Sequence, residues 1–399
     1  MNPSISWRAF PSLVALAIGA LCFGATEAAA GPYVQTDLVS NLPGLATITD
    51  PALVNPWGIA HSATSPFWVS NQGTNTSTLY TVTDSTQVSK VNINPPAGNV
   101  AIPTTASGPQ GPTGQVNNTN TAAFPVSVAS GGDGGSAHFI FSNLNGTISA
   151  WDAGTTAHIQ VTSPGETYTG LAINQAQTML YAANDAGSGS VDIFNSSFAR
   201  IGTFAGDPAA SARGLVPFNA QDIGGTVYVT YAPAGRPAQQ HAAPGQGVVA
   251  AFHEDGTFIG NLITGSQLAA PWGITFSPST FGAFGGDLLV GNFSYDDSVI
   301  NAFDPVTGAF LGTIPIDNGP GNTAGGLWAI GFGVGGSNGS PNTLYFADGI
   351  NGEAAGLFGA INPASVPEPS ALAAFASALA FLGGCRIGWR RRGRARKPV

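Results

Sequence analysis

The side chains able to perform acid–base, nucleophilic or metal chemistry are few and scattered along the chain. The sequence holds five widely separated histidines, namely His61, His138, His158, His241 and His253. Neither H-x-H nor H-E-x-x-H, two common zinc-binding spacings, occurs. The acidic pairs Glu254-Asp255 and Asp296-Asp297 lie in predicted turns, where solvated hairpins explain them better than acid/base dyads. The pattern therefore identifies no catalytic residues and no metal-binding set.

Tryptophan, in contrast, recurs within a longer motif. NPWGIAHS, residues 55–62, returns as APWGITFS, residues 270–277. Each copy is followed by an apolar run ending in Ser-Asn or Gly-Asn, a polar turn, and a second alternating segment. This order predicts a strand, a hairpin and another strand in each copy, and hence an internal repeat.

Weaker copies of the same order bring the number of units to six. Their anchor residues are Trp57, Val126, Thr169, Phe218, Trp272 and Trp328. The separations of 69, 43, 49, 54 and 56 residues between them are close to the length of a four-stranded propeller blade. The apolar runs are short, β-branched and aromatic, without an amphipathic helix pattern. We therefore predict an all-β, six-bladed β-propeller, with a β-sandwich as the second choice.

The first interval is long because of residues 87–122, which are rich in Pro, Thr, Asn and Gly. We interpret this stretch as an irregular insertion, since only QVSKVNI in it alternates like a strand. Part of a degenerate seventh blade is the alternative.

Aligning the units predicts the role of each position. Small residues follow the anchors, namely Gly58, Ser127, Gly170, Asn219, Gly273 and Ala329. Small residues are expected where innermost strands crowd around a propeller axis. The aromatic anchors Trp57, Phe218, Trp272 and Trp328 would lie at one level. They are interpreted either as packing between blades or as an aromatic rim of the central channel that stacks on a sugar or another flat ligand.

A third set of aligned residues ends the second strand of each unit, and four of its six members are asparagine. The set is Asn71, Asn143, Asn184, Tyr231, Asn292 and Asp348. Asn and Asp side chains bond to nearby backbone amides, which gives these residues a local structural role. A calcium-binding ring is the alternative, although this set supplies one carboxylate where a strong site needs several. We therefore expect no cofactor, with Ca²⁺ left open.

The two ends of the chain have the composition of export signals rather than of the domain. Arg8, an apolar run from about Leu13 to Phe23, and the A-x-A pattern of Ala28 and Ala30 predict a signal peptide over residues 1–30. Residues 367–399 contain Pro367-Glu368-Pro369, a predicted single transmembrane helix from about Ala371 to Trp389, and a basic tail. Residues 31–366 would then form the propeller domain.

The predicted domain is strongly acidic. Only Lys90, Arg200, Arg213 and Arg236 are basic within it, against 19 acids, which gives a net charge of about −15. Such a surface repels phosphate backbones and makes nucleic acid an improbable partner. Both cysteines, Cys22 and Cys385, lie in the predicted export signals, so neither disulfides nor thiolate metal sites are expected in the domain.

Two resemblances follow from these stretches. The C-terminal tripeptide, apolar span and basic end together resemble the PEP-CTERM sorting signal, which implies that an exosortase processes the chain. NPWGIAHS with FWVSN, PFNAQDIGGTVYVTYA, PWGITFSP with GDLLVGNF, and GLWAIGFG with TLYFADG resemble an uncharacterised family of secreted bacterial proteins. VSNQGTNTSTLY is also similar to the hairpin of NHL-type propellers, which include binding scaffolds and a few lyases or lactonases.

These resemblances imply a fold and an export route but no catalytic residues. We therefore expect an exported, non-enzymatic binding or scaffold propeller associated with the cell surface or its exopolysaccharide. It would pass through the inner membrane, where it is anchored transiently, to the periplasm, the outer surface or the medium. A metal-dependent hydrolase or lyase, similar to NHL or gluconolactonase-like propellers, is the alternative.

Overall fold

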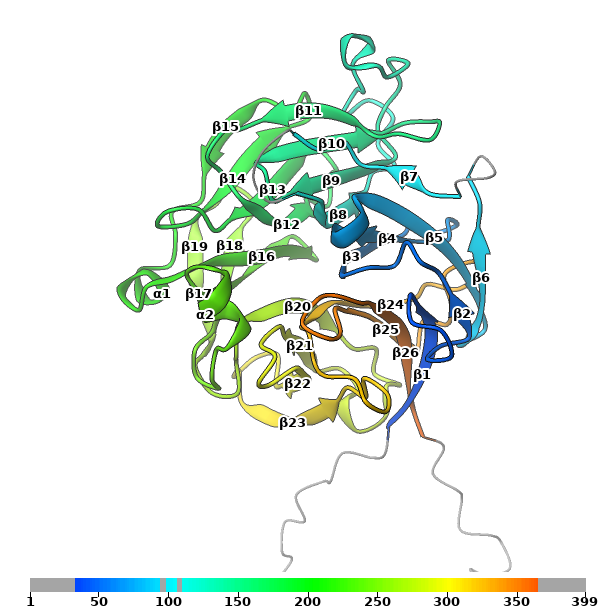
Figure 1. Ribbon diagram of the computed structural model, residues 1–399. Helices are drawn as coiled ribbons and strands as arrows, with labels where there is room; N and C mark the ends of the chain where they lie inside the picture. The colour runs from blue at the N-terminus through cyan, green and yellow to red at the C-terminus, as the bar shows by residue number, and fades with distance from the viewer. Residues whose placement is uncertain (1–32, 94–97, 106–109, 365–399) are drawn as a thin grey trace, which may run out of the picture.

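The computed structural model describes residues 33–93, 98–105 and 110–364. These residues form six mainly antiparallel sheets arranged around a central axis (Figure 1). The prediction of a six-bladed β-propeller is confirmed, and the described residues hold no seventh sheet. The predicted signal peptide, the Pro-Glu-Pro tripeptide and the C-terminal apolar span lie outside the described residues. Within the described residues, no helix has both the length and the apolar character needed to cross a membrane.

Each blade has four main strands that follow one another outward from the axis. The innermost strands are β3 (Pro56–Ala60), β8 (Pro112–Asn117), β12 (Tyr168–Ile173), β16 (Leu215–Ile223), β20 (Pro271–Phe276) and β24 (Leu327–Phe332). The second strands are β4 (Phe67–Asn71), β9 (Phe139–Asn143), β13 (Met179–Asn184), β17 (Thr226–Pro233), β21 (Leu288–Asn292) and β25 (Leu344–Asp348). We number the blades 1 to 6 in this order.

The outer half of each blade completes the sheet. The third strands are β5 (Thr76–Thr83), β10 (Thr147–Trp151), β14 (Ser190–Asn195), β18 (Val248–His253), β22 (Val299–Phe303) and β26 (Leu357–Pro363). The fourth strands are β6 (Gln87–Val91), β11 (His158–Thr162), β15 (Arg200–Thr203), β19 (Phe258–Thr264), β23 (Phe310–Pro315) and β1 (Tyr33–Ser40). Two short strands, β2 (Ile48–Thr49) and β7 (Val100–Ala101), pair with β1 and β5. Two short helices lie in connections. Helix α1 (Pro208–Ala212) joins blade 3 to blade 4, and α2 (Arg236–Gln240) lies between β17 and β18 of blade 4.

The ring closes because blade 6 takes its outer strand from the other end of the domain. Strand β1 runs antiparallel to β26, with Tyr33 opposite Pro363 and Ser40 opposite Leu357. The blue and orange ends of the domain accordingly lie side by side (Figure 1). Closure pairs each of the two terminal strands with a strand from the other end of the domain.

Blade 2 corrects the predicted repeat. Its innermost strand is β8, within the stretch predicted as an insertion, and not the segment around Val126. The aligned residues of this blade are therefore Thr113 and Gly114, and the interval from Trp57 becomes 56 residues. Val126 lies instead in the long β8–β9 connection, where it is fully buried with Phe124. The apolar segment around Val126 covers the core between blades 2 and 3. It resembles a strand only in composition.

The predicted role of the small residues is confirmed by the distances between innermost strands. A Cβ atom on Gly58 would lie 2.6 Å from the Thr113 carbonyl oxygen, and one on Gly114 would lie 2.3 Å from the Leu171 nitrogen. A Cβ atom on Gly273 would lie 2.4 Å from the Trp328 carbonyl oxygen. Since these neighbours are backbone atoms, glycine is what allows the strands to meet around the axis.

Candidate functional site

The four predicted aromatic residues lie together at the end of the axis where the innermost strands begin. Trp57 stacks on Trp328 with 3.5 Å between ring centroids, and Trp272 meets Trp57 edge to face at 6.3 Å. Phe218 lies 5.8 Å from Trp328, and Phe293 stacks on the same indole at 4.2 Å. The four predicted rings are at most 3% exposed. They form a packed aromatic core, as in the packing interpretation, and at this end of the axis the groups above the rings shield them from a ligand.

A charged pair covers this aromatic core. The Arg236 guanidinium carbon lies 4.9, 4.4 and 4.8 Å from the ring centroids of Trp57, Phe293 and Trp328. The same guanidinium forms an ion pair with Glu353. The negative faces of the rings and the carboxylate both favour the guanidinium cation. Residues from blades 1, 4, 5 and 6 thus meet in one contact set at the axis.

The pair is held by neutral donors and by an unusual loop. Tyr295 donates its hydroxyl hydrogen to Glu353 Oε2 over 2.8 Å, and the Asn55 amide donates to Glu353 Oε1 over 3.0 Å. Asn351, Gly352 and Glu353 have φ values of 56°, 63° and 69°. Three successive left-handed residues are costly for non-glycine side chains, and such backbone persists where the surroundings determine it. The loop therefore places Glu353 on Arg236.

The opposite end of the axis opens into a central cavity of about 540 Å³. Its wall comes from all six innermost strands, and Trp272 is the aromatic anchor that contributes to it. The polar side chains on the wall are mostly neutral, namely His61, Gln115, Asn117, Gln175, Gln177, Asn219, Gln221 and Thr275, with Asp222 as the carboxylate. A cavity of this volume is in the range of small-ligand sites, and here polar and apolar side chains share the wall.

Several of these amides hold the wall itself. Gln115 donates its amide hydrogens to the carbonyl oxygens of Gly58 and Trp68, and Asn219 donates to the Trp272 carbonyl over 3.0 Å. Gln221 is exposed on the cavity wall. It is therefore well placed to bond to a ligand.

Asparagines at the ends of second strands have local partners, as predicted. Asn71 donates to the hydroxyls of Thr76 and Thr78, and Asn143 donates to those of Thr147 and Ser149. The amide nitrogen of each asparagine is thus occupied within its own hairpin, while the Oδ1 atoms of Asn71 and Asn143 are buried without a hydrogen-bond partner.

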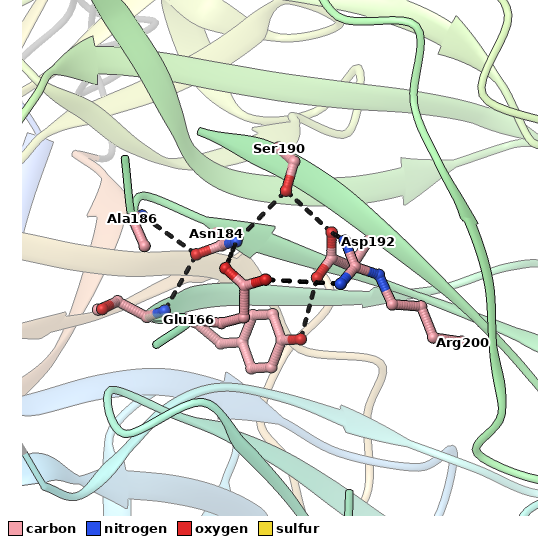
Figure 2. A network of polar contacts seen from close by, with 8 residues as sticks. Glu166, Asn184, Ala186, Ser190, Asp192 and Arg200 are labelled. Atoms are coloured by element: carbon pink, nitrogen blue, oxygen red, sulfur yellow. Dashed lines mark hydrogen bonds and ion pairs between the residues drawn. The ribbon is translucent and has the colours of Figure 1, made fainter. Parts of the chain in front are cut away.

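Blade 3 builds a further local network of polar side chains (Figure 2). Asn184 donates to Glu166 and to the Ser190 hydroxyl, and Arg200 donates to Asp192 Oδ1 over 2.7 Å. Tyr168 donates to Asp192 Oδ2 over 3.0 Å. Burial raises the pKa of the Tyr168 hydroxyl, and the Asp192 carboxylate raises it further. The network is satisfied internally and joins the loop before blade 3 to all four of its main strands.

The histidines stay apart, as their spacing predicts. His61 lies at the cavity, with its Nδ1 and Nε2 atoms 3.1 and 3.2 Å from the carbonyl oxygens of Ser62 and Phe332. Burial lowers the pKa of the His61 imidazole, which favours its neutral form. His241 lies 3.2 Å from Asp296 on the surface. In the part of the chain that the structure describes, no three His, Cys, Asp or Glu side chains are grouped as metal ligands.

One short match to G-x-S-x-G, residues 335–339, lies in the loop between β24 and β25. No helix follows it, so the strand–turn–helix arrangement of a nucleophile elbow is absent from this described segment.

Two polar pairs were not found from the sequence. Arg236 and Glu353 are 117 residues apart. Asp222, near the turn between β16 and β17, lies beside Glu254, in the turn between β18 and β19. The sequence interpretation assigned Glu254 only to a solvated turn with Asp255. Arg236 and Glu353 both lie in connections between second and third strands, of blades 4 and 6, and such connections converge at the same end of the axis.

Comparison with known proteins finds viral relatives that each match 69% of the chain. It is 30% identical over 290 residues to "Uncharacterized protein R648" of Acanthamoeba polyphaga mimivirus, covering 69% of this chain and 67% of that one. The chain belongs to the same family as this protein. "Uncharacterized protein L690" of the same virus is 29% identical over 290 residues, covering 69% and 72%. No family model matches the chain.

Among solved structures, that of streptogramin B lyase has a TM-score of 0.48 and 12% sequence identity. The match covers 84% of this chain and 98% of that one. The names of R648 and L690 describe no activity. The chemistry of the two ends of the axis therefore follows from the residues that lie there.

Proposed function

We propose that this protein is an exported β-propeller of the cell envelope or its surroundings that binds a neutral, hydroxylated ligand, such as a segment of surface polysaccharide or exopolysaccharide. Binding, rather than catalysis, is its role in this proposal. The observation that carries it is the central cavity, whose wall presents neutral amides and hydroxyls among apolar side chains.

The chemistry of the wall supports this ligand class. An amide both donates and accepts hydrogen bonds, as a sugar hydroxyl does, while the apolar faces of a sugar ring pack on side chains such as Ile274 and Phe276. The excess of acids over bases in the domain disfavours polyanions. A neutral polyhydroxylated ligand satisfies both conditions.

The position of the domain ends supports export and processing. Strand β1 begins at Tyr33, just after the expected cleavage site before Gly31, and β26 ends at Pro363, just before Pro367. Removal of both predicted signals would leave every strand of the propeller in place. An exosortase acting near Pro367, Glu368 and Pro369 would therefore release or transfer a complete propeller.

Ligand binding is tested with an oligosaccharide panel and the purified full chain. Gln221→Ala should weaken binding of a selected oligosaccharide about tenfold, the loss expected for one hydrogen bond of about 1.4 kcal/mol. Gln87→Ala, which removes an exposed amide on outer strand β6, is the matched control and should bind normally. Equal affinities of all three chains would reject the central cavity as the binding site.

Export is tested separately by fractionation and mass spectrometry of the chain expressed in an exosortase-containing bacterium. We expect an N-terminus at Gly31 and loss of the C-terminal tail. Replacement of Pro367, Glu368 and Pro369 by alanine should retain the uncleaved chain in the inner membrane. Processing unaffected by this replacement would reject the sorting signal.

A hydrolase or lyase is the second candidate, favoured by a single observation. Burial raises the pKa of Asp222, and Glu254 raises it further, while Gln175 and Gly225 lower it by hydrogen bonding. A protonated carboxyl on a cavity wall can act as a general acid. The test is turnover of a lactone and oligosaccharide panel by the wild type, with loss of that turnover in Asp222→Asn.

A further inference from the structure

Asp222 has one oxygen satisfied and one without a partner. It lies near the end of β16 on the wall of the central cavity and is 8% exposed. Its Oδ1 atom accepts from the Gln175 side chain over 2.6 Å and from the Gly225 nitrogen over 3.0 Å. Its Oδ2 atom is buried without a hydrogen-bond partner. A buried carboxylate oxygen in this condition requires a proton, a donor or a cation.

A second carboxylate lies beside it. Glu254, in the turn between β18 and β19, accepts from the Gln175 backbone nitrogen over 3.2 Å and from the Asn174 amide over 3.3 Å. Gln175 therefore bonds to both carboxylates and brings the two carboxyl groups next to each other. A neighbouring carboxylate raises the pKa of Asp222, and a compensating positive charge would relieve this effect.

No basic side chain of the described residues supplies that charge, since all four have partners elsewhere. Lys90 pairs with Asp50, Arg200 with Asp192 and Glu166, and Arg236 with Glu353, while Arg213 donates to the Gly245 carbonyl.

Of the neighbouring groups, Asp255 adds negative charge and Tyr181 stays neutral. Tyr181 donates its hydroxyl hydrogen to the Glu254 backbone carbonyl over 2.8 Å. Burial raises the pKa of Tyr181, and the charges of Glu254, Asp222 and Asp255 raise it further. His253, an exposed residue, precedes Glu254 in the chain.

We propose that Asp222 and Glu254 form a divalent-cation site for Ca²⁺ at the wall of the central cavity. The atoms that would bind the cation are carboxylate oxygens, which Ca²⁺ prefers as ligands. The two carboxylates supply the negative charge that a weak site of the extracellular type needs. Water and the ligand in the cavity complete the coordination. Asp222, Glu254 and water are sufficient to bind the cation without any ligand in the cavity. Only the coordination of Ca²⁺ by saccharide hydroxyls rests on the proposed function.

The test is calorimetric titration of CaCl₂ into the chelator-treated full chain at pH 7, with thermal unfolding measured in parallel. We expect one site with a Kd of roughly 10⁻⁴–10⁻³ M, typical of extracellular calcium modules, and a higher Tm with Ca²⁺ because only the folded chain holds the site. Asp222→Asn and Glu254→Gln keep the size of each side chain and should each weaken Ca²⁺ binding at least tenfold.

Asp255→Asn removes an exposed carboxylate in the same turn and should leave the affinity unchanged. Equal Ca²⁺ binding by wild type and Glu254→Gln would overturn the proposal. So would an absence of binding together with higher stability of Glu254→Gln, since that result identifies a proton shared by the two carboxyl groups. Saccharide affinity measured with and without Ca²⁺ then tests the cavity ligand independently.

Discussion

Trp57 stacks on Trp328, with their ring centroids 3.5 Å apart and their planes inclined by 20°. The two indoles hold equivalent positions in blades 1 and 6, which are neighbours only because the ring closes. Both rings are fully buried. The tryptophan at this blade position therefore joins the first and last blades at the axis, in addition to marking innermost strands.

Replacing Trp328 by alanine should destabilise the propeller strongly. The change removes stacking on Trp57 and Phe293, opens a cavity, and leaves Asn55 Oδ1 without its indole donor at 3.0 Å. We expect a loss of about 3–5 kcal/mol in unfolding free energy, measured by urea denaturation. Phe310→Ala removes an aromatic ring that is 41% exposed and should cost less than about 1 kcal/mol. Similar losses in the two variants would contradict the aromatic core.

Gly114 should not tolerate even a methyl group. A Cβ atom there would lie 2.3 Å from the backbone nitrogen of Leu171 in the next blade, and neither strand can move without its neighbours. Gly114→Ala should therefore cost about 2 kcal/mol or more. Gly331→Ala is the matched control, since Gly331 also lies on an innermost strand but has open space around its Cβ position. The prediction fails if both variants have the wild-type Tm.

The Arg236–Glu353 pair should show strong coupling in a double-mutant cycle. Arg236→Met removes the cation from three aromatic faces and leaves Glu353, whose side chain is 14% exposed, without its ion-pair partner. Since the Arg236 side chain is 31% exposed, solvent screening reduces the effect, and we expect a loss of about 1–3 kcal/mol. Adding Glu353→Gln should recover part of this loss, because the uncompensated charge is then gone. Additive losses would show that the two side chains act independently.

The fold could be predicted because its determinants are local and repeated. Period-two apolar runs, Asn at strand ends and small residues after the anchors follow from backbone packing in any blade, so one clear copy indicates the others. Blade 2 was placed wrongly because Thr113 replaces the aromatic anchor, while Phe124 and Val126 imitate a strand. The correct copy, PTGQVN, keeps only the small residue and the preceding Pro.

The polar pairs at the two ends of the axis could not be predicted in the same way. Arg236 lies in α2, Glu353 lies in a left-handed loop, and Glu254 lies in a turn, so no repeated position carries them. Their partners depend on how the connections fold over the axis. The burial of the four aromatic anchors also depends on that cover, which is why their spacing predicted their common level but not their exposure.

Asp348 should make the stability of the propeller depend on pH. It is fully buried at the end of β25, where four other blades carry Asn, and burial raises its pKa to about 8. Below about pH 4 the group is protonated in both the folded and the unfolded chain. As the pH rises toward about 8, the unfolded chain releases this proton while the folded chain keeps it, so the contribution of Asp348 to stability falls, and it levels off above that pH. Asp348→Asn carries no such proton and should lose this slope between pH 5 and pH 8, with its largest gain in Tm over wild type at the alkaline end.

Thermal unfolding of wild type and Asp348→Asn across this pH range measures the slope. Asp84→Asn, at an exposed turn, is the control and should keep the slope of the wild type. A parallel pH dependence in wild type and Asp348→Asn would mean that the buried group is already ionised in the folded chain at neutral pH.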